Sequence, residues 1–263
     1  MPIELMSIET CSLPSDCSES FGLKPEGKAF DDHSATVRIR VWQNEVLVLP
    51  DRGTHYGFVW QGAASLKRAG QIASLPLQSG MYFSLAEAGT LCGEGSAGMV
   101  VTYLAHRGEF SLGGPVAAVG RLAYIDGGTT SLLVAPLEAG DPCLNALYMP
   151  AQVVQTVHSH PSDRVGIVIR GAGDCIAVEE TATPDQRVRD RHALRPGTVF
   201  YISAHQPHQF CTGAMGLDLI VFHPDSDMGV THRNHPMLRR TLVDNISAVD
   251  LPEIQTQMSA RQN

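Results

Sequence analysis

The chain alternates short apolar runs with turn-forming residues along most of its length. Runs rich in Val, Ile, Leu and Tyr are separated by glycine and proline, of which the sequence holds 25 and 16. Few stretches repeat apolar residues at the spacing of a buried helix face. Short apolar runs bounded by turn residues are typical of antiparallel strands. The pattern therefore predicts an all-β protein.

The strand-like runs fall into two blocks that share the same order. In each block an apolar strand ends at a glycine, Gly62 in the first and Gly171 in the second. A later aromatic strand then begins after another glycine, Gly80 or Gly197. This self-similarity indicates an internal duplication.

We expect four segments. Residues 1–35 are predicted to form an irregular N-terminal arm, 36–135 a first barrel, 136–230 a second barrel and 231–263 a C-terminal tail. Within the passage between the blocks, LAYIDGGTTSLLVAP predicts a hairpin around Asp126. The length of 263 residues allows two domains of ordinary size.

Three histidines in the second block form a candidate metal site. His158 and His160 flank one residue, so on a β-strand both imidazoles point to the same face. A return strand in a small barrel could bring His208 opposite this pair. Three neutral nitrogen ligands suit iron, nickel, copper or zinc better than calcium or magnesium. Taken alone, however, a His-x-His pair can also be a surface feature.

The first block lacks these histidines. It contains no His-x-His pair, and setting Gly80 against Gly197 places Leu91 opposite His208. His55 is its imidazole near the equivalent position, and we interpret it as a core or interface residue. The first barrel is therefore expected to bind no metal.

Charge and cysteine content limit the classes of binding partner and metal site that the chain is expected to have. The net charge is −8 and no block of Lys or Arg stands out, so nucleic acid and anionic membranes are not expected partners. The N-terminus shows no secretory signal and no apolar run is long enough to cross a bilayer, which predicts a cytoplasmic protein. None of the six cysteines forms a Cys-x-x-Cys pair, which argues against a zinc ribbon. A less favoured alternative places Cys175 or Cys211 beside the metal.

The second block resembles the cupin superfamily over roughly residues 140–225. The motif residues that match are His158, His160, Gly171, Pro196, Gly197, Pro207 and His208. The first block, from about 36 to 110, is similar to a cupin only in strand order and glycine placement. The resemblance implies two cupin-type jelly-roll β-barrels in one chain, a bicupin, with a metal-binding C-terminal barrel and a degenerate N-terminal one. It also implies a homodimer or a higher homo-oligomer.

Arg164 stands where cupins commonly carry a glutamate ligand. A guanidinium cannot ligate a cation, so the site resembles the three-histidine cupins, some of which are non-haem iron oxygenases with a nearby arginine that binds a substrate carboxylate. Arg164 could therefore bind a carboxylate, or it could pair with Asp163 in a structural role. His205, three residues before His208, could act at the barrel mouth as an acid, base or hydrogen-bond donor, or lie exposed on a loop.

These features predict a metal-dependent enzyme with one divalent transition metal per chain. The leading hypothesis is a mononuclear non-haem iron(II) dioxygenase that acts on a small, carboxylate-bearing substrate with dioxygen. Nickel, copper, zinc or manganese are alternatives for the metal. A non-redox metal-assisted isomerase, lyase or cyclase, or a non-catalytic small-ligand-binding cupin, are the alternatives for the function.

Overall fold

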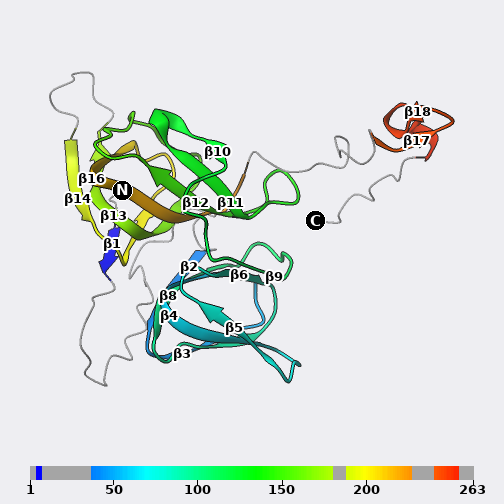
Figure 1. Cartoon of the computed structure of the whole chain (residues 1–263), viewed down its shortest axis with the longest axis horizontal. Helices are drawn as coiled ribbons and strands as arrows, with labels where there is room; N and C mark the ends of the chain where they lie inside the picture. The colour runs from blue at the N-terminus through cyan, green and yellow to red at the C-terminus, as the bar shows by residue number, and fades with distance from the viewer. Residues whose placement is uncertain (1–3, 8–36, 180–187, 227–239, 255–263) are drawn as a thin grey trace.

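The computed structural model describes residues 4–7, 37–179, 188–226 and 240–254. These residues form two eight-stranded sheets, a separate two-stranded hairpin and short 3-10 turns (Figure 1). The prediction of an all-β chain with two jelly-roll barrels is confirmed. No helix in this part of the chain has the length and apolar character that a bilayer-spanning segment needs.

The first barrel is built around one long strand. Its strands are β2 (Val37–Gln43), β3 (Val46–Leu49), β4 (Thr54–Arg68), β5 (Ser74–Gln78), β6 (Tyr82–Leu85), β7 (Gly89–Cys92), β8 (Ser96–Tyr103) and β9 (Ser111–Gly113). The main order is β2-β8-β4-β6-β9, while β5 and β7 pair with the far half of β4 and β3 pairs with β7. Trp42, Leu66, Phe83 and Leu91 lie in its buried interior.

The second barrel repeats this plan around β13. Its strands are β1 (Glu4–Ser7), β10 (Leu122–Ala123), β11 (Thr129–Val134), β12 (Cys143–Met149), β13 (Arg164–Val178), β14 (Val188–Leu194), β15 (Thr198–Ile202) and β16 (His208–His223). The order is β1-β15-β13-β16-β12-β11-β10, with β14 on β13. The turn η1 (Ile125–Gly127) joins β10 to β11, as the hairpin prediction required.

Sheet membership corrects two of the expected segment boundaries. Residues 4–7 of the expected irregular arm form β1, which pairs antiparallel with β15. Strands β10 and β11, expected within the first barrel, belong to the second sheet. β1 covers the edge of β15 as β9 covers the edge of β6. A strand of four residues is too short to show a clear alternation of apolar and polar residues in the sequence.

The expected C-terminal tail is described only in part. Residues 240–254 contain the hairpin of β17 (Leu242–Val243) and β18 (Ile246–Ser247), followed by η4 (Ala248–Asp250) and η5 (Pro252–Ile254). The polar end from residue 255, the stretch 227–239 and the rest of the arm lie outside the described residues.

Both long strands bend at a glycine in the left-handed region. Gly62 in β4 has φ 77° and Gly171 in β13 has φ 79°. A Cβ on Gly62 would lie 2.0 Å from the carbonyl oxygen of Gly95, and one on Gly171 would lie 2.1 Å from that of Gly216. Only glycine tolerates both the φ value and the close approach. The glycines that suggested a duplication therefore make the same bend in each barrel.

The outer faces of the two barrels share one apolar core. Tyr56 and Phe58 of β4 lie in the same buried cluster as Val165 of β13 and Phe222 of β16. The rings of Tyr56 and Phe222 lie 4.9 Å apart between centroids, within the range of favourable aromatic pairs. Separating the barrels would expose this cluster to water, so each barrel supports the other.

Candidate metal centre

The three predicted ligands come together at one mouth of the second barrel. His208 begins β16, whereas His158 and His160 lie in the segment between β12 and β13. The expectation that this pair sits on a regular strand is wrong, because the segment makes only isolated bridges. One of these joins His158 to His208: the His158 N–H donates to the His208 carbonyl (3.0 Å), and the His208 N–H donates to the His158 carbonyl (2.8 Å).

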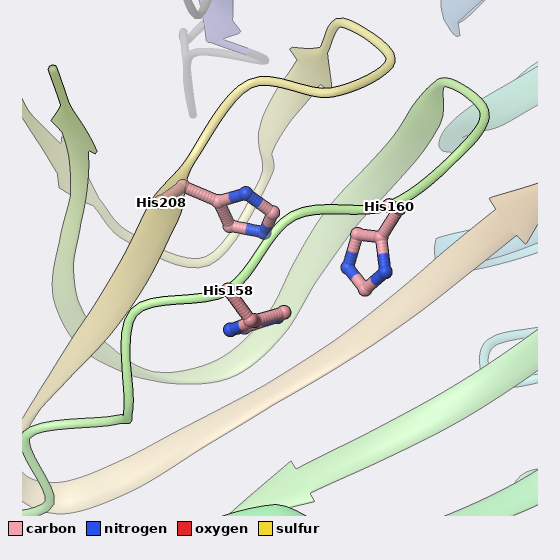
Figure 2. A group of neighbouring side chains, drawn as sticks. All are labelled: His158, His160 and His208. Atoms are coloured by element: carbon pink, nitrogen blue, oxygen red, sulfur yellow. The ribbon is translucent and has the colours of Figure 1, made fainter. Parts of the chain in front are cut away.

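The imidazoles converge on a common point (Figure 2). One ring nitrogen from each of the three histidines lies within 4.8 Å of the others. The ring centroids of His158 and His208 are 4.5 Å apart, and His160 lies 4.9 Å from His158 and 5.2 Å from His208. Three imidazole nitrogens are a donor set that suits a first-row transition metal such as iron, nickel, copper or zinc.

Backbone carbonyls fix which nitrogen of two rings faces the site. His158 Nδ1 lies 2.9 Å from the Thr156 carbonyl, and His208 Nδ1 lies 2.8 Å from the Gln206 carbonyl. Because a carbonyl oxygen only accepts, each Nδ1 must carry the proton. The lone pair of each Nε2 is then left for a metal, and the ring orientation is held as in known metal-bound histidines.

A further layer of hydrogen bonds supports these carbonyls. The Asp126 carboxylate accepts from the Thr156 backbone N–H (2.7 Å) and from the Thr156 hydroxyl (2.9 Å). Asp126 itself has φ 55° in the turn η1. The hairpin between the blocks therefore anchors the loop that carries His158, a role with no signal in the sequence.

The site lowers the pKa of two of its three imidazoles, those of His208 and His160. Burial lowers the pKa of His208 to about 4, with His158 and Arg164 lowering it further and the Gln206 carbonyl opposing them. Burial, followed by the charge of Arg164 and the other two histidines, lowers the pKa of His160 to about 3. Near neutral pH both rings are in the deprotonated form that binds metals.

The histidines open into a small pocket of about 60 Å³ inside the second barrel. Its apolar wall consists of Leu147, Phe200, Ile202, Phe210 and Val221. Its polar side chains, besides the three histidines, are Tyr124, Thr130, Asn145, Gln155, Arg164 and His223. A mostly apolar cavity with a few convergent polar groups is the usual form of a small-molecule site.

Comparisons with known proteins agree with this architecture. The sequence matches no family model and no curated protein. Among solved structures, a salicylate 1,2-dioxygenase from Pseudaminobacter salicylatoxidans is similar at 13% identity and TM-score 0.54, over 78% of this chain and 76% of that one. A cupin 2 conserved barrel domain protein from Leptotrichia buccalis is similar at 12% identity and TM-score 0.52, over 73% and 86%. An IolB-like protein from Salmonella typhimurium shows 16% identity and TM-score 0.51, over 71% and 82%.

The chain has the cupin fold. Its second cupin barrel carries the three-histidine group, which is the one group of potential metal ligands of this kind among the residues that the structure describes. The first barrel can be compared with it strand by strand.

Strand register shows what replaces the histidines in the first cupin barrel. Gly62 corresponds to Gly171, a difference of 109 positions, so Arg68 corresponds to Ala177. Because Arg68 pairs with Gly89 and Ala177 pairs with His208, the counterpart of His208 is Gly89. The expected counterpart, Leu91, is two positions off. The connection 203–207 is two residues longer than the connection 86–88, which a simple alignment of glycines does not show.

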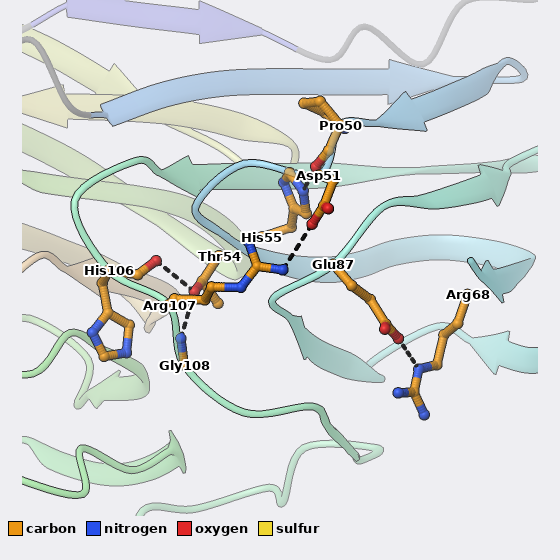
Figure 3. A network of polar contacts seen from close by, with 9 residues as sticks. All are labelled: Pro50, Asp51, Thr54, His55, Arg68, Glu87, His106, Arg107 and Gly108. Carbon is orange, nitrogen blue, oxygen red and sulfur yellow. Dashed lines mark hydrogen bonds and ion pairs between the residues drawn. The ribbon is translucent and has the colours of Figure 1, made fainter. Parts of the chain in front are cut away.

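The remaining counterparts in the first barrel serve structural roles. Leu49 pairs with Gly89 as His158 pairs with His208, and it is buried. By the same difference of 109 positions, Asp51 takes the place of His160 and accepts from Arg107 at 2.8 Å (Figure 3). His55 takes the place of Arg164, is fully buried, and bonds to Thr102 Oγ1 and to the Pro50 carbonyl, both at 2.8 Å.

Arg164 lines the pocket and is 8% exposed. Its Nη1 donates to the Ser162 carbonyl (3.0 Å), the Ser162 hydroxyl (2.7 Å) and the Asp163 carbonyl (2.9 Å). The expected alternative, an ion pair with the Asp163 carboxylate, is not formed, because that carboxylate accepts from the Ala204 N–H at 2.9 Å. Asp225 Oδ1 lies 4.0 Å from Nη1, and Nε is buried without a partner.

His205 lies apart from the pocket. Its side chain is exposed and is not part of the lining. It has φ 60°, and its backbone N–H donates to the His160 carbonyl at 2.7 Å. The structure thus places His205 in the exposed position that was the alternative to a catalytic role. The thiols of Cys175 and Cys211 do not line the pocket either.

The lining residues that were not predicted as site residues include His223 and Asn145. His223 follows Val221 by two positions on β16, so both face the interior. Burial, then Arg164 and His160, lowers the pKa of His223 well below its ordinary value. Asn145 has the same inward parity on β12 as Leu147. Alternation along these strands could have identified both residues once the strand ends were known.

Proposed function

We propose that this protein is a mononuclear non-haem iron(II) dioxygenase that acts on a small carboxylate-bearing substrate. The observation that carries the proposal is the convergence of three imidazoles beside a buried arginine that has an unpartnered nitrogen. The similarity to a salicylate 1,2-dioxygenase supports the choice through the fold alone.

His158, His160 and His208 would hold the metal. The donor set fits a borderline first-row dication, and two of the rings have their Nε2 lone pairs fixed toward the site. Iron(II) bound there would supply redox chemistry with dioxygen, because three protein ligands leave further coordination positions open.

Arg164 would bind and orient the substrate carboxylate. Its Nη1 donates to three protein oxygens, whereas its buried Nε has no partner, and the side chain lines the pocket. The side of a guanidinium that carries Nε suits a carboxylate, with which charge-assisted hydrogen bonds are strong. A substrate anion would also balance a buried charge for which Asp225 compensates only partly, at 4.0 Å.

The other lining residues would position the substrate and protect the reaction. Phe200, Phe210 and Val221 exclude water from the reacting region. His223, kept neutral by burial and by Arg164, could accept a proton from a substrate hydroxyl. We also propose a homodimer, because two β-barrels leave edge strands such as β3 that association can cover.

The test is anaerobic loading with iron(II) followed by measurement of oxygen consumption with a panel of small carboxylic acids. We expect about one metal per chain, and oxygen uptake with at least one acid. His158→Ala, His160→Ala and His208→Ala should each lose metal, whereas the exposed His205→Ala should retain it. Retention of metal in all three site variants would refute the metal site. Conversion of an acid without oxygen uptake would instead support a non-redox reaction.

A further inference from the structure

The pocket contains two buried polar atoms that have no hydrogen-bond partner. They are Nε of Arg164 and Oδ1 of Asn145. The other two such atoms among the described residues, Ser111 Oγ and His192 Nε2, belong to side chains outside the pocket lining. Buried polar groups are nearly always paired in native proteins, so two unpaired atoms on side chains that line one cavity point to a ligand that pairs with both.

Asn145 is a polar exception in an apolar row. Alternate residues of β12 face the barrel interior, and Leu147 and Met149 on that row belong to the interior cluster. A leucine would complete this row without leaving an amide unpaired. The carboxamide therefore costs the empty barrel stability, and this cost is offset when a ligand supplies the missing partner.

Asn145 on β12 and Arg164 on β13 are separated by one strand, β16, and are offset by two residues along it. β12 and β13 both pair with β16, where Asn145 lies opposite Val221 and Val165 lies opposite Phe222. Neighbouring strands are about 4.8 Å apart, so the two backbones are separated by roughly 10 Å. Both side chains extend from these backbones into the same pocket of about 60 Å³. A single small molecule can therefore contact both groups.

We propose that Asn145 is a substrate-binding residue and that the pocket selects a small hydroxylated carboxylic acid. The carboxylate pairs with Arg164 and the hydroxyl with Asn145; the carboxylate half of this assignment rests on the proposed function. A hydroxyl both donates and accepts, so it pairs with the carboxamide in either amide orientation. An acid without the hydroxyl leaves Asn145 buried and unpaired, which gives the pocket its selectivity.

The test measures ligand binding without turnover. The full chain is loaded with zinc, and isothermal titration calorimetry compares benzoate with 2-, 3- and 4-hydroxybenzoate. The rigid ring holds the hydroxyl at three distances from the carboxylate. We expect at least one hydroxybenzoate to bind about tenfold more tightly than benzoate. Asn145→Leu should abolish this preference while leaving zinc content and benzoate affinity unchanged. Asn145→Ser, whose side chain is shorter and lacks the carboxamide, should behave in the same way and is the second variant if Asn145→Leu does not fold.

Three results would overturn the inference: a preference that survives in the folded Asn145 variants, no hydroxybenzoate that binds better than benzoate, or no binding of any of the four acids at millimolar concentration. The proposed function fails separately. If iron and oxygen give no reaction but the Asn145-dependent preference for a hydroxybenzoate is present, only the dioxygenase assignment is refuted. If oxygen uptake occurs but does not depend on Asn145, only the proposed contact between Asn145 and the substrate hydroxyl is refuted.

Discussion

Phe222 should couple the stability of the two barrels. Its side chain is fully buried in the cluster that both barrels share, with ring centroids 4.9 Å from Tyr56 and 6.0 Å from Tyr103 of the first barrel. Replacing a buried phenylalanine by alanine costs about 3–5 kcal/mol. Since part of that loss falls on contacts across the interface, Phe222→Ala should destabilise both barrels together.

The positions of the tryptophans provide the assay. The chain has two tryptophans, Trp42 and Trp60, and both belong to the first barrel. Urea unfolding of Phe222→Ala followed by tryptophan fluorescence therefore reports on the barrel that was not changed. With an m value of about 3 kcal/mol/M, the midpoint should fall by roughly 1–1.7 M, and far-UV circular dichroism should show the same shift.

A matched control removes apolar atoms from a surface position of the first barrel. Val46 is 51% exposed, so Val46→Ala should change stability by less than about 0.5 kcal/mol. If Phe222→Ala shifted the dichroism midpoint but not the tryptophan midpoint, the barrels would unfold independently and the shared core would not be cooperative.

Further predictions concern the site and the assembly. Asp126→Ala should lower metal affinity about 10–100-fold, because the loop with Thr156 and His158 loses its anchor, and metal titration of the folded variant measures this. The metal-free protein should lose stability as the pH falls below about 6.5, because the folded pKa values of His208, about 4, and His160, about 3, lie below that value and the unfolded chain binds more protons; urea unfolding at pH 7 and pH 5 tests the sign. Arg164→Lys should retain metal but raise the Michaelis constant for the acid, since an ammonium cannot pair in a bidentate way; a large loss of thermal stability would point to a structural role instead. Light scattering at micromolar concentration should give at least a dimer mass, and a monomer mass would contradict the homo-oligomer.

The fold could be predicted from the sequence because its signals are local. The alternation of apolar and polar residues sets the strands, and Gly62 and Gly171 mark the bends at which both barrels turn. β1 escaped prediction because its four residues gain their structure from pairing with β15, a contact distant in sequence. The counterpart of His208 in the first barrel was also predicted wrongly, as Leu91 and not Gly89. The length of the loop before the strand determines this alignment, and a periodic pattern does not.

The three histidines could be predicted as neighbours from spacing and motif, but the contacts of their surroundings could not. The hydrogen bond from Thr156 to Asp126 and the unpaired Oδ1 of Asn145 depend on how distant segments pack together, which the periodicity of the sequence does not encode. For Arg164, the sequence left open a substrate carboxylate or Asp163 as the partner. The structure instead pairs it with the Ser162 segment and places Asp225 nearby, while the Asp163 carboxylate accepts from the backbone N–H of Ala204.

The alternation that builds the barrels also connects the site to the interface. On β16, Ile220 and Phe222 face the shared core, while Val221 and His223 face the pocket. A strand with both faces buried cannot shift by one residue without moving histidine into the apolar core and phenylalanine into the pocket. The first barrel, which has Leu49, Asp51 and Gly89 at the positions of the three histidines, therefore still contributes to the site. By burying the outer face of β13 and β16, it fixes the register that aims Arg164 and His223 inward.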